Sequence, residues 1–189
     1  MRKAGLTVFV VLVVGLAVLV YGCNPWIKPK VERRPLPRLN PTSYVFAASI
    51  SEVQGAIRKV KCCGMALEFG NRALFSGDLL KQPGSGNDAY LHNFHSPIGN
   101  SNVYVSKGRP LPYLAEFHLH LIPIDQSHTR VEIFTFKSEV IAGETWWGVH
   151  GTPANIYVGV TPTTVEEYRI LREIGAALHT EGMPPLIQS

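Results

Sequence analysis

The sequence predicts an α+β fold, in which an antiparallel β-sheet meander is covered by a helix near its start and a long helix at the C-terminus. Most of residues 44–189 consists of short runs rich in β-branched and aromatic residues, separated by turn residues. These connections are too short for the crossovers that parallel strands require. Amphipathic helical stretches stand on either side of the strand series, and they can cover the apolar face of the sheet.

The first predicted helix lies within residues 49–60, "SISEVQGAIRKV". Ser49 followed three residues later by Glu52 is the pattern of a capping box, in which each side chain accepts the other residue's backbone N–H. Ile50, Val53, Ile57 and Val60 then recur at helical spacing and predict a buried stripe.

Seven runs predict strands, and residues typical of turns separate them. The runs are residues 44–47, 66–69, 89–94, 102–105, 113–124, 129–136 and 155–160. The main predicted turns are "QPGSGND", "SPIGNS", "KGRPLP", "DQSH" and "AGETWWGVHGTP". Consecutive strands joined in this way pair as an antiparallel meander.

The second predicted helix starts at Pro162 and is stopped by Gly182 and the proline after it. Its first turn offers Thr163 and Thr164 as caps, and its apolar stripe comprises Val165, Tyr168, Leu171, Ile174 and Leu178. The order of strand, helix, several strands and long helix resembles helix-grip domains, which are also found in some envelope-assembly lipoproteins.

The N-terminus has the plan of a secretory signal, with Arg2 and Lys3 followed by an uncharged run from Ala4 to Ile27. The run is also long enough to span a bilayer as a helix. Because length fits both interpretations, the residues around Cys23 have to distinguish them.

Residues 19–23, "LVYGC", resemble the bacterial lipobox, although Tyr21 is bulkier than the usual residue at its place. The resemblance implies cleavage after Gly22, diacylation of the Cys23 sulfur and acylation of the new amine, with fatty acids such as palmitate. Several acyl chains give stable membrane anchoring. Asn24 in place of an aspartate implies the outer rather than the inner membrane, with the folded domain in the periplasm.

Three segments follow: a signal peptide (1–22), a Pro-rich basic tether (23–43) and one globular domain (44–189). The tether carries five basic residues against Glu32, whereas residues 44–189 are net −2. A basic segment beside a bilayer attracts anionic headgroups, although a solvated linker has the same composition. The domain lacks a basic stripe, so nucleic acid is not expected as a partner.

The basic tether also supports a second topology. Positive charge just beyond an apolar span favours retention of that side in the cytoplasm. If the leader were not cleaved, the protein would be a single-pass, signal-anchored protein with a cytosolic domain.

The strand "EFHLHLI" contains the sharpest chemical candidates, because Glu116, His118 and His120 fall on one face of a strand. Two histidines at i and i+2 can share a metal ion, and further ligands would come from His128, His150 or the pair His92 and His95. The alternative is a half-solvated strand with its histidines on the polar face. Since the chain has no metal-binding motif, neither a cofactor nor a metal is expected, and a metal-dependent hydrolase is the alternative.

Two further pairs are candidates for other roles. Trp146 and Trp147 lie between glycines in a predicted loop, where they could grip a sugar, a peptide or the membrane interface, or else close the end of the core. Cys62 and Cys63 are adjacent, and structural thiols, a vicinal disulfide and pairing with another chain all stay open.

No nucleophile elbow and no pair of catalytic carboxylates is present, and "DQSH" is typical of a turn whose side chains bond their own backbone. The sequence therefore predicts a non-catalytic, membrane-anchored envelope module whose partner is a protein, a lipid or a glycan.

Overall fold

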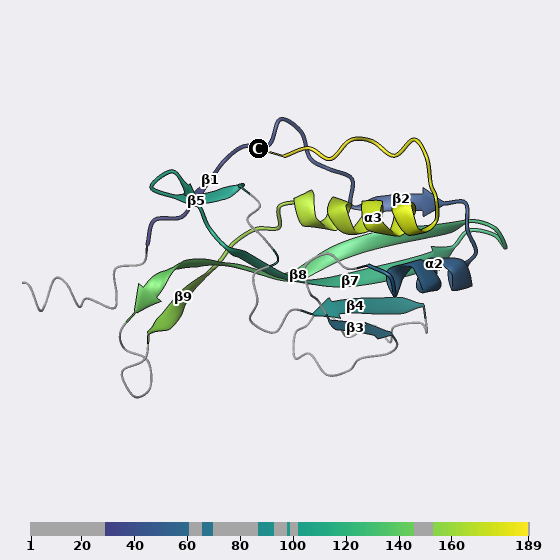
Figure 1. Ribbon diagram of the computed structural model, residues 1–189, viewed down its shortest axis with the longest axis horizontal. Coiled ribbons are helices and arrows are strands. Elements are labelled where there is room, and N and C mark those ends of the chain that lie inside the picture. The colour runs from purple at the N-terminus through teal and green to yellow at the C-terminus, as the bar shows by residue number, and fades with distance from the viewer. Residues whose placement is uncertain are drawn as a thin grey trace, which may run out of the picture.

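The computed structural model describes residues 29–60, 66–69, 87–92, 98, 102–145 and 153–188. In these ranges the chain forms antiparallel sheets and two helices, which confirms the α+β class (Figure 1). The strands are β1 (Glu32–Arg33), β2 (Ser43–Phe46), β3 (Ala66–Phe69), β4 (Asp88–His92), β5 (Tyr104–Ser106), β6 (Arg109–Pro110), β7 (Tyr113–Pro123), β8 (Thr129–Thr145) and β9 (Ala154–Gly159). The helices are α2 (Ile50–Ile57) and α3 (Val165–Ala177).

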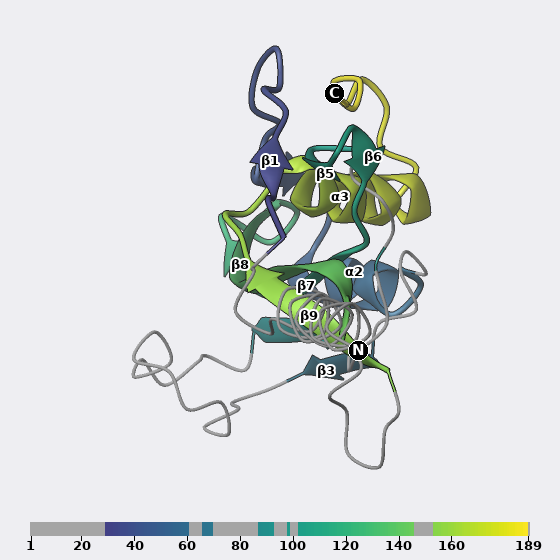
Figure 2. The same ribbon diagram turned by 90° about the vertical axis from the view of Figure 1, so that its left-hand side faces the viewer.

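The larger sheet has six strands in the order β2-β8-β7-β4-β3, and β9 pairs with the far half of β8. All of its pairs are antiparallel. Both helices pack on one face of this sheet (Figure 2). The predicted meander is present in the consecutive pairs β3–β4, β7–β8 and β8–β9.

The two helices differ in how well the sequence predicted them. Helix α2 forms the expected capping box between Ser49 and Glu52. Helix α3 has 13 residues, so the prediction of a long helix reaching Gly182 is not confirmed. It ends at Ala177, and His179 adopts the left-handed conformation with φ 55°. The chain after α3 folds back instead of continuing the helix.

Strand β8 is longer than predicted, because it continues to Thr145 through residues that suggested a turn. Its first four residues pair with β2 and its second half with β9, while β7 pairs along the other edge from Thr129 to Val140, so three partners support one 17-residue strand. A local sequence window does not show which strands pair with it, which explains why the extension was missed.

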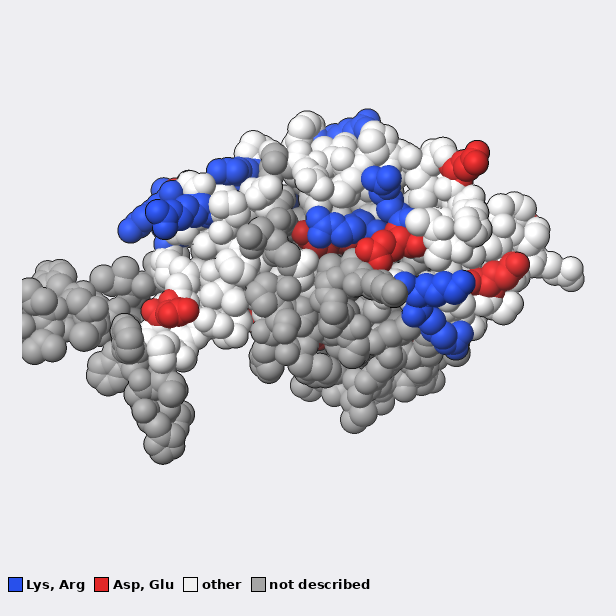
Figure 3. Space-filling model, viewed as in Figure 1, with Lys and Arg blue, Asp and Glu red and all other residues white. Residues whose placement is uncertain are grey.

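The second half of the predicted tether packs against the domain. In β1, Glu32 pairs with Val105 of β5, and the Arg34 N–H donates to the Val103 carbonyl at 2.7 Å. The β1-β5-β6 sheet therefore joins the Pro-rich segment to the domain, at the end of the molecule where Lys and Arg side chains gather (Figure 3). Residues 23–28 lie outside the described residues.

Asn40 ties the N-terminal segment to the chain that follows α3. Its amide nitrogen donates to the Ile187 carbonyl at 2.9 Å, and its amide oxygen accepts the Ile187 N–H at 2.8 Å. The Asn40 backbone N–H also donates to Thr164 Oγ1 at 3.1 Å. Asn40 is buried, so these bonds replace water that the amide has lost.

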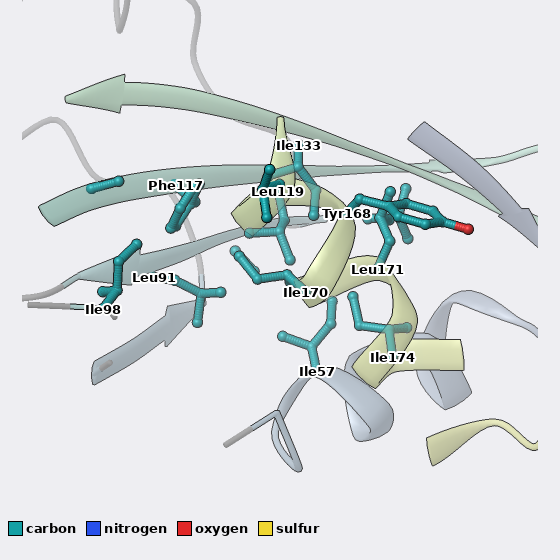
Figure 4. Packing of buried hydrophobic residues seen from close by; sticks show 14 of the residues in the cluster. Ile57, Leu91, Ile98, Phe117, Leu119, Ile133, Tyr168, Ile170, Leu171 and Ile174 are labelled. Carbon is teal, nitrogen blue, oxygen red and sulfur yellow. The ribbon is translucent and has the colours of Figure 1, made fainter. Parts of the chain in front are cut away.

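The core lies between the helices and the inner face of the larger sheet (Figure 4). Ile57 of α2 and Ile170 of α3 meet Leu119 of β7 in this layer. The predicted α3 stripe is confirmed for Val165, Tyr168, Leu171 and Ile174, which are all fully buried. Burial of such side chains contributes about 1.5–3 kcal/mol each and holds the layers together.

Two adjacent acids, Glu166 and Glu167, are buried in the first turn of α3, each only 2% exposed. The Thr163 hydroxyl donates to Glu166, and the Thr135 hydroxyl donates to Glu167. Burial raises the pKa of both carboxyls, and the hydroxyl bonds oppose that rise only in part. The buried phenol of Tyr113 also has a raised pKa, because of burial first and then the charges of Glu167 and Glu166.

We expect Asn40→Ala to lower the free energy of unfolding by about 1–3 kcal/mol, because the Ile187 carbonyl and N–H lose their partner. Urea denaturation of the full chain measures the change. Asn155→Ala is the matched control, since Asn155 is exposed and should change stability by less than about 0.5 kcal/mol. Equal midpoints for Asn40→Ala and wild type would contradict the role of Asn40.

Glu167→Gln should flatten the dependence of stability on pH. A carboxyl whose pKa is raised by folding stabilises the fold below its ordinary value of 4.5, and that stability is lost as the pH rises through the folded pKa. Glutamine keeps the shape without the charge. The unfolding free energy of wild type should therefore fall more steeply than that of Glu167→Gln between pH 4.5 and pH 7.

Urea denaturation across that pH range is the measurement, and Glu181→Gln, at an exposed position, is the control. Identical slopes for wild type and Glu167→Gln would show that the buried carboxyl does not resist ionisation.

Candidate metal centre

Strand β7 carries core residues on one face and two histidines on the other. Phe117 and Leu119 are fully buried and Leu121 is 1% exposed, whereas His118 and His120 lie on the opposite face of the larger sheet. This is the alternation that the sequence predicted. In the register with β4, His120 stands opposite Asp88 and His118 opposite Tyr90.

One carboxylate oxygen of Asp88 is within hydrogen-bonding distance of both histidines. Its Oδ1 lies 3.0 Å from His118 Nε2 and 2.7 Å from His120 Nδ1. The Asp88 side chain is only 2% exposed, while those of His118 and His120 are 23% and 38% exposed. A buried carboxylate is stable only when it is hydrogen-bonded or paired with positive charge, and the two imidazoles supply those contacts.

Aromatic rings hold His118 in place. Tyr90 stacks on its imidazole with the ring centroids 4.7 Å apart and the planes within 8°, and Phe134 lies 6.1 Å away. Tyr90 is buried, and its pKa is raised by burial first and then by the charge of Asp88. A ring packed in this way presents its nitrogen in a fixed direction, which lowers the cost of binding an ion.

The three side chains have the composition and spacing of a metal site. One ligand atom from each of Asp88, His118 and His120 lies within 4.8 Å of the others. Zinc binds imidazole nitrogen at about 2.0–2.1 Å and carboxylate oxygen at about 2.0–2.2 Å, so small side-chain rotations would bring all three atoms into its shell. Two imidazoles and one carboxylate suit a transition metal better than Ca²⁺ or Mg²⁺.

Asp88 was not among the site residues predicted from the sequence, because it stands at the end of the turn-like run "QPGSGND". The only signal in the sequence was its position directly before a predicted strand. The residues near Asp88 do not show that this strand, β4, pairs with β7. The structure supplies that pairing and with it the carboxylate.

His128, a predicted third ligand, lies elsewhere, in the turn between β7 and β8. Its Nδ1 is 3.0 Å from Asp125 Oδ1, which also accepts the Ser127 backbone N–H at 2.7 Å. The predicted self-bonding turn is therefore confirmed. The Ser127 N–H, followed by the imidazole of His128, lowers the pKa of Asp125 to about 2.

The other predicted site residues fall on side chains that the structure does not describe. Cys23, the Trp146–Trp147 pair, the Cys62–Cys63 pair, and the histidines His95 and His150 lie outside the described residues, and His92 is described only as backbone in β4. Across the described ranges, no helix has the length and apolar character needed to cross a bilayer.

Comparisons with models of known protein families, with curated proteins and with solved structures each gave no match to this chain. The chemistry of its own residues is therefore the basis for any functional conclusion.

Proposed function

We propose that this protein is a lipoprotein of the bacterial envelope whose domain binds a zinc-like transition-metal ion through Asp88, His118 and His120. Acyl chains on Cys23 hold it at the membrane, at the outer rather than the inner membrane, with the domain in the periplasm. The observation that carries the metal function is the convergence of one carboxylate oxygen and two imidazole nitrogens from two adjacent strands.

A metal ion suits this cluster because the cluster contains the buried carboxylate of Asp88. A carboxylate that is 2% exposed needs hydrogen bonds or a positive charge beside it, and a divalent cation carries the largest charge that such a site can hold. The two imidazoles keep partial access to solvent, so an ion can reach them from outside. The stacked Tyr90 ring restricts rotation of the His118 imidazole, so less side-chain freedom is lost when a metal ion binds.

Metal-dependent hydrolysis is the second candidate function, with His118 and His120 as ligands. It is favoured by the number of ligands, because catalytic zinc sites use three protein ligands and keep one position for water or substrate. The first proposal is the non-catalytic one, since the sequence contains no nucleophile elbow and no pair of catalytic carboxylates.

Two finer proposals concern the domain. The arrangement of the sheet, with α3 packed on its inner face, supports a helix-grip type of fold, although α3 is short. Trp146 and Trp147 are proposed as a contact for an envelope protein, lipid or glycan, because they adjoin the end of β8 at Thr145.

The full chain should bind one Zn²⁺ after treatment with a chelator, measured by isothermal titration calorimetry. Asp88→Asn and the double variant His118→Ala/His120→Ala should weaken binding at least ~10-fold, since even partners outside the first ligand sphere cost that much. Asp88→Asn is the sharper test, because asparagine keeps the size of the side chain and can still bond both imidazoles.

Asp125→Asn/His128→Ala is the matched control, because it removes an Asp–His pair of similar spacing from an exposed turn. It should leave zinc binding unchanged. Wild type that binds no zinc, or variants at Asp88, His118 and His120 that bind it equally well, would refute the metal centre. Turnover of a p-nitrophenyl ester by the zinc-loaded wild type but not by Asp88→Asn would favour the hydrolase.

Anchoring is tested by mass spectrometry of the N-terminus of the protein isolated from membranes. Wild type should begin at an acylated Cys23, whereas Cys23→Ala should lose the acyl mass and the cleavage. Cys62→Ala/Cys63→Ala is the control and should keep both. A wild-type protein that begins at Met1 without acyl chains would instead support the single-pass topology.

A further inference from the structure

Basic side chains gather at the end of the molecule that carries the small β1-β5-β6 sheet, as well as at other places on the same face (Figure 3). The segments that form and adjoin this sheet contribute six exposed basic residues, Lys30, Arg33, Arg34, Arg38, Lys107 and Arg109. We call them the basic end surface. Glu32 is the one acidic residue in the segments 29–40 and 102–110, whereas elsewhere beyond residue 3 acidic residues outnumber basic ones. The charge of the mature chain is therefore polarised toward this end.

Tertiary structure brings the two parts of this surface together. Pairing of β1 with β5 places Arg33 beside Tyr104, and Ser106 of β5 pairs with Arg109 of β6. The Arg34 guanidinium donates to the Gly108 carbonyl at 3.1 Å, next to Lys107. Residues about 74 positions apart in the sequence thus share one surface, and their backbones are fixed before any partner binds.

A hollow in this surface has the chemistry of a phosphate site with apolar edges. It measures about 410 Å³ and is lined by Arg33, Pro35, Leu36, Arg38 and Leu39. Each guanidinium has five N–H donors, so the bond from Arg33 to the Pro162 carbonyl still leaves donors for a phosphate. Leu39 is 68% exposed, so its apolar side chain can enter the boundary between headgroups and acyl chains.

The chain itself limits how far this surface can be from the membrane. Lys30 follows Cys23 by seven residues, and a fully extended chain of that length spans about 25 Å at most. Whether acyl chains on Cys23 or a retained apolar segment holds the N-terminus, the basic end surface is the part of the domain tied closest to the bilayer.

We propose that the basic end surface docks onto anionic phospholipid headgroups of the membrane that holds the N-terminus. Arg33 and Arg38 take a lipid phosphate in the hollow, and the other four cations contact neighbouring headgroups. Docking fixes the orientation of the domain, with α2, at the opposite end of the long axis, pointing away from the bilayer (Figure 1). The inference rests on the proposed membrane anchoring and is independent of the metal centre.

The test compares lysine acetylation in the full, membrane-anchored chain reconstituted into vesicles of phosphatidylcholine alone or with phosphatidylglycerol. Mass spectrometry follows Lys30 and Lys107 on the surface, with the exposed Lys59 beyond α2 as an internal control. We expect Lys30 and Lys107 to react at least ~threefold more slowly with phosphatidylglycerol present, and the protection to vanish at high salt. Lys59 should react equally in both vesicles.

The variant Arg33→Gln/Arg38→Gln should lose most of the protection of Lys107, although it leaves that lysine intact. Equal reactivity in both vesicle types, or protection that persists at high salt, would overturn the proposal. Flotation with the vesicles is measured in the same samples. A protein that fails to float with either vesicle would refute the anchoring itself, so the two failures are distinguishable.

Discussion

The alternation of side chains along β7 is the constraint on which both the core and the candidate site depend. Burial of Phe117, Leu119 and Leu121 against the helices leaves His118 and His120 no other direction than the opposite face. A shift of one residue in the pairing would exchange the two sets, burying imidazoles and exposing the aromatic and aliphatic side chains. The free energy that stabilises the core thus also fixes the positions of the proposed metal ligands.

Neighbouring strands turn that alternation into a site. On its own, β7 supplies two imidazoles, and the pairing with β4 adds the Asp88 carboxylate and the Tyr90 ring. A carboxylate so deeply buried is costly to the fold without partners, and the two imidazoles are the partners that the structure gives it. The exposed pair of Asp125 and His128 shows the contrasting case, where the same residue types only shape a turn.

The fold also links the two chain ends. Asn40 joins the N-terminal segment to Ile187, and Tyr168 of α3 donates to the Pro184 carbonyl at 2.6 Å. Together with the β1–β5 pairing, these bonds make the N-terminal segment part of the domain from about Lys30 onward. A segment that is packed in this way would transmit orientation from the proposed anchor to the domain, which a flexible linker would not do.

The sequence by itself determined the α+β class, the position of α2 with its capping box, the two faces of β7 and the buried stripe of α3. Each of these depends on residues within a few positions of one another, where periodicity and capping chemistry act. Tertiary structure alone decided the end of α3 at Ala177, the extension of β8 to Thr145, the packing of β1 and the partnership of Asp88 with His118 and His120. These features depend on which strands pair and in which register, and the burial of apolar side chains across the whole domain sets that pairing.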